Sequence, residues 1–171
     1  MDEEYGELRD AVKIEEWEKN CQPISLSELD ADLANSLSEL EKIVQCDLLR
    51  ADARIKNYIW AMDEEGKIKI AIEELAVYKS EAQFNGYPRR RGYIHPSKEN
   101  KLGHPTLLNG GKARIAGELA FDESEESGKL QWIFNVNSGR YCRFIPPNEQ
   151  QVENAASLFK EFGLDIIVDY D

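Results

Sequence analysis

The sequence predicts an α+β fold: N-terminal helices followed by an antiparallel sheet of about five strands, with a C-terminal helix packed on that sheet. Residues 114–121 and 130–136 alternate between polar and apolar side chains with a period of two, which is typical of half-buried strands. Residues 26–44 carry leucines and a valine at steps of three and four, which indicates an amphipathic helix. Residues 149–168 indicate a second amphipathic helix followed by a final strand.

The stretch 103–142 is the centre of the predicted fold. Its two alternating runs are joined by the acidic linker 122–128, which ends in glycine, so they form a hairpin with a long loop. Apolar residues share one face of the first strand: Ile115, Gly117, Leu119 and Phe121. Glu118 lies on the opposite face. Because polar residues of distinctive kinds gather at this hairpin, we expect a functional site here.

The N-terminal part is predicted to be helical. Residues 7–19 form a short charged helix with a partial apolar stripe. Ser25 and Glu28 fit a capping box that opens the leucine-rich helix. The leucine stripe serves core packing or, alternatively, an interface with a partner. We expect residues 1–50 to pack on, or extend from, an α+β domain that spans 51–171.

Local signals also place the elements on either side of the central hairpin. Residues 53–72 form a first hairpin around a polar turn that ends in Gly66, and the alternative is a helix over 48–62. The segment 84–108 is rich in glycine and proline, which predicts a long irregular stretch of a kind that is often functional. Asn148 is a good N-cap for the final helix, and Gly163 suits its C-terminal end.

The charge of the chain restricts the class of partner. The 33 acidic and 21 basic side chains give a net charge of −12. This excess argues against nucleic acid or an anionic membrane as the main partner, because phosphate binding needs clustered lysine and arginine. It suits rapid association with a basic protein.

The cysteines and the N-terminus indicate a reducing compartment. Cys21, Cys46 and Cys142 are far apart and form no paired motif, so we expect reduced thiols, no metal site and no cofactor. The acidic N-terminus lacks the features of a signal peptide, and no apolar run has the length of a membrane span. The sequence therefore predicts a cytoplasmic protein that does not bind membranes.

A run of three arginines is the basic cluster of the chain. Arg89, Arg90 and Arg91 lie between Tyr87 and Tyr93. Guanidinium groups bind phosphates and carboxylates through paired hydrogen bonds, so the run is a candidate ligand site. The alternative is a solvated loop, or arginines that neutralise acids of the same chain.

A catalytic interpretation combines His104, Glu118 and Arg140. Histidine is the usual proton carrier near neutral pH, and Glu118 would orient it. Alternatively, His104 binds a turn backbone next to Pro105, and Glu118 is an exposed residue on an uncovered sheet face.

The turn after the second strand also has two interpretations. Asn137, Ser138, Arg140 and Tyr141 belong to a segment whose residue types favour tight turns. Alternatively, successive backbone N–H groups and Ser138 hold an anion, with Arg140 adding positive charge.

Three segments resemble a module of bacterial polymorphic-toxin and secreted-effector loci. They are GHPTLLNGGKARIAGELAF, LQWIFNVNSGRY and EQQVENAASLFKEFGLDI, at 103–121, 130–141 and 149–166. The resemblance extends to the first hairpin and leaves out the helical N-terminal part. It implies a role in competition between bacteria or in interaction with a host, and it assigns no catalytic residue.

Three hypotheses about function follow. The first is a small acidic binding protein, an immunity or inhibitor partner of a basic toxin, as in a toxin–antitoxin pair. Its contact residues would be acidic side chains of the leucine-rich helix and of the acidic loop: Glu28, Asp32, Glu39, Asp122, Glu123, Glu125 and Glu126. The second is an effector enzyme that acts on a nucleotide or another phosphorylated ligand at 103–142. The third is a structural accessory domain without a ligand.

Overall fold

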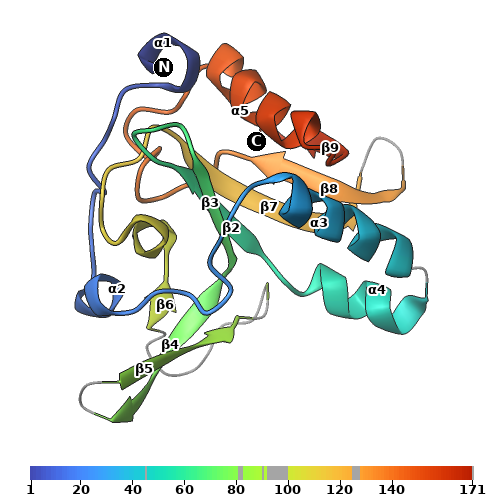
Figure 1. Ribbon diagram of the computed structural model, residues 1–171, viewed down its shortest axis with the longest axis horizontal. Coiled ribbons are helices and arrows are strands. Elements are labelled where there is room, and N and C mark those ends of the chain that lie inside the picture. The colour runs from blue at the N-terminus through green and yellow to red at the C-terminus, as the bar shows by residue number, and fades with distance from the viewer. Residues whose placement is uncertain (45, 81–82, 90, 92–99, 125–127, 171) are drawn as a thin grey trace.

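Six strands form the main sheet of the computed structural model, which describes residues 1–44, 46–80, 83–89, 91, 100–124 and 128–170 (Figure 1). In spatial order they are β1 (Ser27–Glu28), β3 (Ile68–Ile72), β2 (Tyr58–Met62), β7 (Ala116–Glu123), β8 (Leu130–Asn135) and β9 (Ile166–Val168). The α+β prediction is confirmed, with six strands in the main sheet where about five were expected. The sheet is mixed rather than antiparallel, since β9 runs parallel to β8. The helix α5 (Glu149–Glu161) lies between these two strands in the chain and brings it back, so that β9 can run beside β8 in the same direction.

Both predicted hairpins are present, and they belong to one sheet. β2 pairs with β3 and β7 pairs with β8, while β2 also pairs with the first half of β7, residues 116–119. The backbone at Gly117 on β7 lies close to the backbone of Asn135 on β8. A Cβ atom there would lie 1.9 Å from the carbonyl oxygen of Asn135, so this position requires glycine.

The N-terminal helices differ from the prediction. They are α1 (Asp2–Tyr5), α2 (Glu16–Asn20), α3 (Ala31–Ile43) and α4 (Asp47–Arg54). Asp30, not Ser25, caps α3, because its side chain accepts a hydrogen bond from the Leu33 N–H. The Ser25 hydroxyl donates instead to the buried carboxylate of Glu74 at 2.6 Å and accepts from the Ile72 N–H. The residues after Ser25 therefore form β1 before the helix begins.

A smaller sheet continues from the end of β3. Its described strands are β5 (Gln83–Pro88), β4 (Glu74–Ser80) and β6 (Lys101–Leu102), in that spatial order. The 3₁₀ helix η1 (His104–Leu108) follows β6. The segment expected to be irregular therefore contains a strand within 84–88 and a strand and a helical turn within 101–108, and residues 90 and 92–99 lie outside the described residues.

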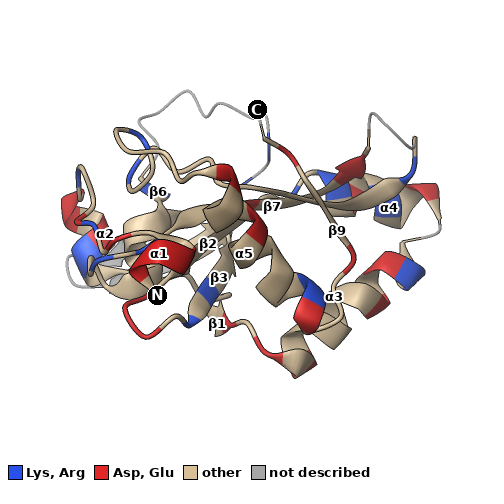
Figure 2. Cartoon of the chain, turned by 90° about the horizontal axis from the view of Figure 1, so that it is seen from above, with Lys and Arg blue, Asp and Glu red and all other residues tan. Residues whose placement is uncertain are grey.

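The main core lies between one face of the six-stranded sheet and the helices. Figure 2 shows α3 and α5 on the same side of this sheet. Trp132 and Phe134 are fully buried on that face, and Phe159 of α5 packs edge-on against Phe134 with ring centroids 5.2 Å apart. The leucine stripe joins the same core through Leu37 and Val44. Core packing therefore accounts for the buried part of the stripe.

The opposite face of the sheet is covered by η1 and the 138–142 segment near β2 and β3. Leu107, Tyr141 and Cys142 pack there against Ile59 and Ala61. Farther along β7 and β8, the same face borders a cavity. The candidate site therefore lies on the part of this sheet face that η1 and the 138–142 segment leave open.

Two further facts concern the state of the cysteines and the lengths of the helices. All three cysteines are free thiols, and Cys21 and Cys142 are buried. Among the described residues, no helix combines the length and the apolar character of a membrane-spanning segment.

Candidate functional site

A cavity of about 400 Å³ lies over the open face of β7, β8 and β9, and we call it the sheet-face groove. Its apolar floor consists of Ala120, Ile133, Ile167 and Val168. Four carboxylate side chains also line it: Glu118, Asp122, Glu123 and Asp169. Arg91 is the one cationic side chain among the described residues that line the groove. The groove therefore combines an apolar floor with an excess of negative charge.

The strand alternation explains why Glu118 faces the groove. Ile115, Leu119 and Phe121 enter the main core, as the period-two pattern predicts. Glu118 and Asp122 consequently lie on the other face. Glu118 is half-buried, which falls between the two alternatives of a buried and an exposed carboxylate.

The environment of Glu118 favours its protonated form. Burial is the largest cause that raises the pKa of this carboxyl, and the nearby carboxylate of Glu73 raises it further. Lys101, a hydrogen bond with Asn57, and Arg91 act in the opposite direction. Glu118 is therefore a carboxyl in a cavity that takes up a proton more readily than an ordinary glutamate, which is a common property of functional sites.

Glu73 anchors a charged cluster beside the groove. Its carboxylate is almost fully buried and contacts both Arg89, at 2.7 Å, and the ammonium group of Lys101. Sequence reasoning missed Glu73, Lys101 and the groove residue Asn57. The available signal was the acidic pair that begins at Glu73, because it interrupts a long apolar β-type run.

The described arginines of the basic run bind acids of the same chain. Arg89 pairs with Glu73, and Arg91 pairs with Asp122, which Arg54 also contacts at 2.6 Å. Burial raises the pKa of Asp122, but hydrogen bonds from the Glu123 N–H and from the arginines outweigh it and lower the pKa overall. Arg90 lies outside the described residues. The geometry at Arg89 and Arg91 is that of internal neutralisation.

His104 lies beneath the backbone of β7. The ring is buried, and Nε2 is 2.9 Å from the Gly117 carbonyl oxygen, so the neutral ring donates its Nε2–H to that oxygen. Burial lowers the pKa of His104 to about 4. His104 thus contacts the residue that precedes Glu118, whereas Arg140 binds Glu18 on α2. The three residues of the catalytic interpretation do not meet in one cavity.

The 138–141 turn is held by its own side chains. The Ser138 hydroxyl accepts from the backbone N–H groups of Arg140 and Tyr141, at 3.4 and 3.3 Å. The Tyr141 hydroxyl donates to the Gly111 carbonyl at 2.6 Å. These hydrogen bonds correspond to the turn interpretation, since they occupy N–H groups that an anion would need.

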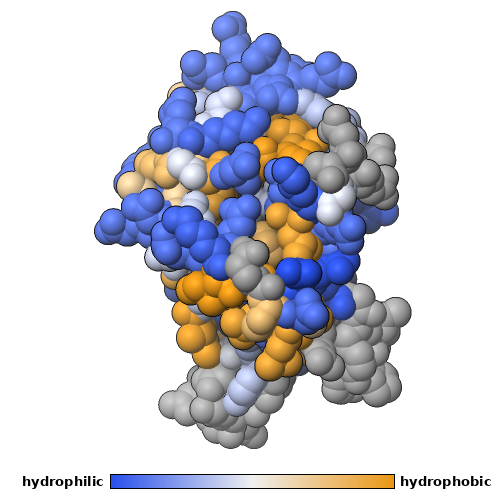
Figure 3. All heavy atoms as spheres, turned by 90° about the vertical axis from the view of Figure 1, so that its right-hand side faces the viewer, coloured by the Kyte–Doolittle hydropathy of each residue, from blue (hydrophilic) through white to orange (hydrophobic). Residues whose placement is uncertain are grey.

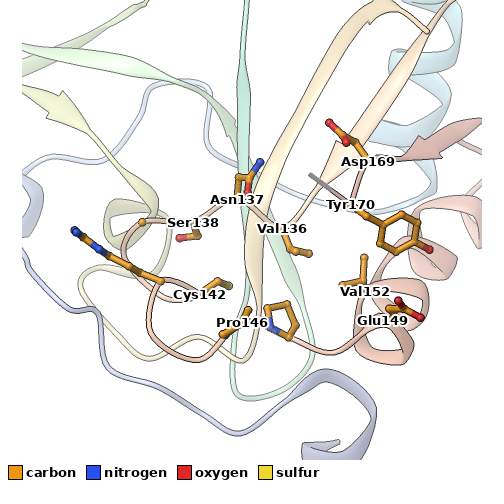
Figure 4. Close-up of a pocket in the computed structure, with 12 residues that line it drawn as sticks. Val136, Asn137, Ser138, Cys142, Pro146, Glu149, Val152, Asp169 and Tyr170 are labelled. Carbon is orange, nitrogen blue, oxygen red and sulfur yellow. The ribbon is translucent and has the colours of Figure 1, made fainter. Parts of the chain in front are cut away.

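A second cavity, of about 670 Å³, lies where β8, the start of α5 and the C-terminal segment meet, and we call it the C-terminal cavity (Figure 4). Figure 4 shows Val136, Pro146, Val152 and Tyr170 around one space. The polar residues of its lining include Asn137, Arg143, Glu149 and Asp169. Asp169 also lines the sheet-face groove, so the two cavities share a wall.

The acidic residues expected to contact a partner have mixed surroundings. Glu28 contacts Lys69, and Glu39 contacts Lys42 at 2.6 Å, so neighbouring lysines offset their charges. Asp32, in the first turn of α3, and Glu123 are exposed. α3 carries three acidic residues and one basic residue, Lys42, which lies in its last turn. Glu125 and Glu126 lie outside the described residues.

Apolar side chains also reach the surface where α3 meets α4. Figure 3 views this end of the molecule and shows apolar atoms between polar ones. Leu48 on α4 is 79% exposed and lines neither cavity. It therefore offers a control position for experiments on the cavities.

Comparison with family models, with curated proteins and with solved structures finds no match to this chain. Within the described part of the chain, no three histidine, cysteine, aspartate or glutamate side chains are grouped so that they could hold a metal ion.

Proposed function

We propose that this chain is an acidic binding protein that captures a basic protein partner through the sheet-face groove. One observation carries the proposal: four carboxylates line the groove, and its one described cation, Arg91, contacts Asp122. A lysine or arginine of a partner places its aliphatic stem on an apolar surface and its charged end near carboxylates. The floor and walls of the groove offer this combination.

The charge of the whole chain supports the same partner class. A net charge of −12 attracts a basic protein from a distance and raises the association rate at low salt. The resemblance of 103–166 to modules of polymorphic-toxin loci supports a toxin or effector as this partner. In that setting the chain acts as an immunity protein in the cytoplasm of the producing bacterium.

The decisive experiment is co-expression with the proteins encoded beside this chain. We expect a stoichiometric complex with a basic neighbour, whose association rate falls as salt rises. Glu118→Gln removes one negative charge from the groove and should slow association. The matched control is Glu16→Gln, which removes the same charge from an exposed position on α2.

Two results would refute the proposal. The first is the lack of a complex with any basic neighbour. The second is a complex in which Glu118→Gln and Glu16→Gln change the association rate equally, because the groove would then contribute nothing beyond net charge.

A second candidate function is an enzyme in which Glu118 transfers a proton. The half-buried carboxyl in a cavity, with its raised pKa, favours this alternative. The carboxylate excess is less suited to a phosphorylated substrate. Toxicity of the chain in a naive cell, lost in a folded Glu118→Gln variant, would support the enzyme. Harmless expression of both forms would count against it.

A further inference from the structure

We propose that the C-terminal cavity receives a large apolar side chain of the same basic partner, so that the partner presents a cationic group and an apolar anchor side by side. This inference rests on the proposed function. It adds the chemistry of the second contact, which is an aromatic or large aliphatic residue close to a lysine or arginine.

The walls of the C-terminal cavity are suited to an apolar anchor. Val152 of α5 is buried at its base, and Val136 and Pro146 border the same space (Figure 4). The Tyr170 hydroxyl donates to the Glu153 carboxylate, which holds the aromatic ring at the edge of the cavity. A cavity with fixed apolar walls is the type of pocket that accepts the dominant side chain of an interface.

Exposed apolar residues lie beside this cavity. Phe144 is 72% exposed and Ile145 61% exposed, and this pair precedes the lining residue Pro146 at the rim of the cavity. Tyr170 is 59% exposed on the opposite wall. A group of large apolar side chains on the surface is more typical of a contact with another molecule than of a loop that faces only solvent.

The position of Asp169 connects the cavity to the groove. Its backbone N–H donates to the Phe134 carbonyl at 2.8 Å, which fixes it directly after β9. Its neighbours divide between the cavities, with Val168 in the groove and Tyr170 in the C-terminal cavity. A single partner surface that passes over Asp169 therefore reaches both.

Charge indicates the nature of the residues next to the anchor. Glu149 and Asp169 line the cavity, and Glu153 lies against Tyr170, whereas Arg143 is the one cation among the described lining residues. Arg143 lies 5.7 Å from the ring centroid of Phe144. The surplus of carboxylates favours a basic segment around the apolar residue and disfavours an acidic one.

The test uses synthetic peptides with blocked ends. Each contains two arginines and one tryptophan separated by a glycine linker of varied length. One control peptide replaces tryptophan by glycine, and another replaces the arginines by glutamines. Affinities are measured by titration calorimetry at low salt. We expect one linker length to bind about tenfold more tightly than the arginine-only peptide, which corresponds to one well-placed anchor.

Variants of the chain locate the binding site of the tryptophan. Tyr170→Ala and Ile145→Ser should remove the tenfold advantage and leave affinity for the arginine-only peptide unchanged. Leu48→Ser is the matched control, because Leu48 is an exposed apolar residue that lines neither cavity. It should retain the full advantage.

The outcomes separate the two proposals. If the arginine-only peptide binds and no linker gives a tryptophan advantage, the inference is overturned and the proposed function stands. An advantage that persists in Tyr170→Ala and Ile145→Ser also overturns it. If the arginine-only peptide does not bind, or binds equally to Glu118→Gln and Glu16→Gln, the proposed function itself fails.

Discussion

Nη2 of Arg140 lies 3.0 Å from Oε1 of Glu18, a carboxylate that is fully buried although it is 122 residues away in sequence. The same oxygen accepts the Gly103 N–H at 3.1 Å. Arg140→Met should therefore destabilise the protein by about 3 kcal/mol, since it leaves a buried charge without its cation. Urea unfolding measures this loss.

The double variant Glu18→Gln with Arg140→Met tests the cause. It should recover part of the lost stability, because the charge that required Arg140 has also been removed. If the double variant is as unstable as the sum of the two single variants, the ion pair is not the reason for the loss.

Gly117→Ala should destabilise the protein by about 3 kcal/mol or more, because its Cβ would overlap the Asn135 carbonyl oxygen. Gly139→Ala is the control, as a Cβ there meets nothing within 4 Å, and its effect should stay within about 0.5 kcal/mol. Thermal unfolding of both variants measures the two changes in stability. Equal melting temperatures would mean that β7 and β8 do not approach as closely as described.

His104 should make the protein sensitive to mild acid. Burial lowers its folded pKa from 6.5 to about 4, so the unfolded chain takes up a proton first as the pH falls. Stability is therefore lost between pH 6.5 and about 4, by a total of about 3 kcal/mol from this residue. His104→Gln lacks this loss.

Comparing the wild type with His104→Gln isolates the contribution of the histidine to the pH dependence of stability. We expect His104→Gln to be less stable than the wild type at pH 7, with a gap that narrows as the pH falls toward 4. A gap that stays constant with pH would contradict a buried neutral ring.

Glu118 should have the opposite effect on stability. Burial and Glu73 raise the pKa of Glu118 in the folded state, so the charged form is disfavoured there. The cost is absent well below its ordinary value of 4.5 and develops as the pH rises through and above that value. Glu118→Gln should therefore gain stability relative to the wild type between pH 4 and 7 in denaturant titrations. A difference that does not depend on pH would show that the carboxyl is solvated like an ordinary one.

Local patterns predicted the elements that local interactions determine. The alternation through Leu119 and Trp132 gave the central hairpin and its buried face, and Asn148 caps α5 as expected. The signal at Ser25 failed because Glu74, from a distant strand, binds its hydroxyl. A capping box is a local motif, and a tertiary hydrogen bond outweighed it.

The candidate site was predictable only in part, for the same physical reason. The side of the strand on which Glu118 lies follows from strand geometry. The partners of Arg91 and Arg140 depend on contacts across the fold. The C-terminal cavity forms only where the stretch 136–152 meets residues 169–170 in the folded chain, so the pattern around Pro146 or Tyr170 alone contains no indication of it.

The attachment of the N-terminal segment has a consequence for synthesis of the chain. Val12 donates its N–H to the Arg140 carbonyl at 2.8 Å, and the Glu18 carboxylate pairs with the side chain of the same arginine. A ribosome needs on the order of ten seconds to add the intervening residues, so the first-made segment has no native docking site during that time. It stays exposed to proteases and chaperones on the nascent chain until residue 140 has been made, although it is the first part of the chain to be synthesised.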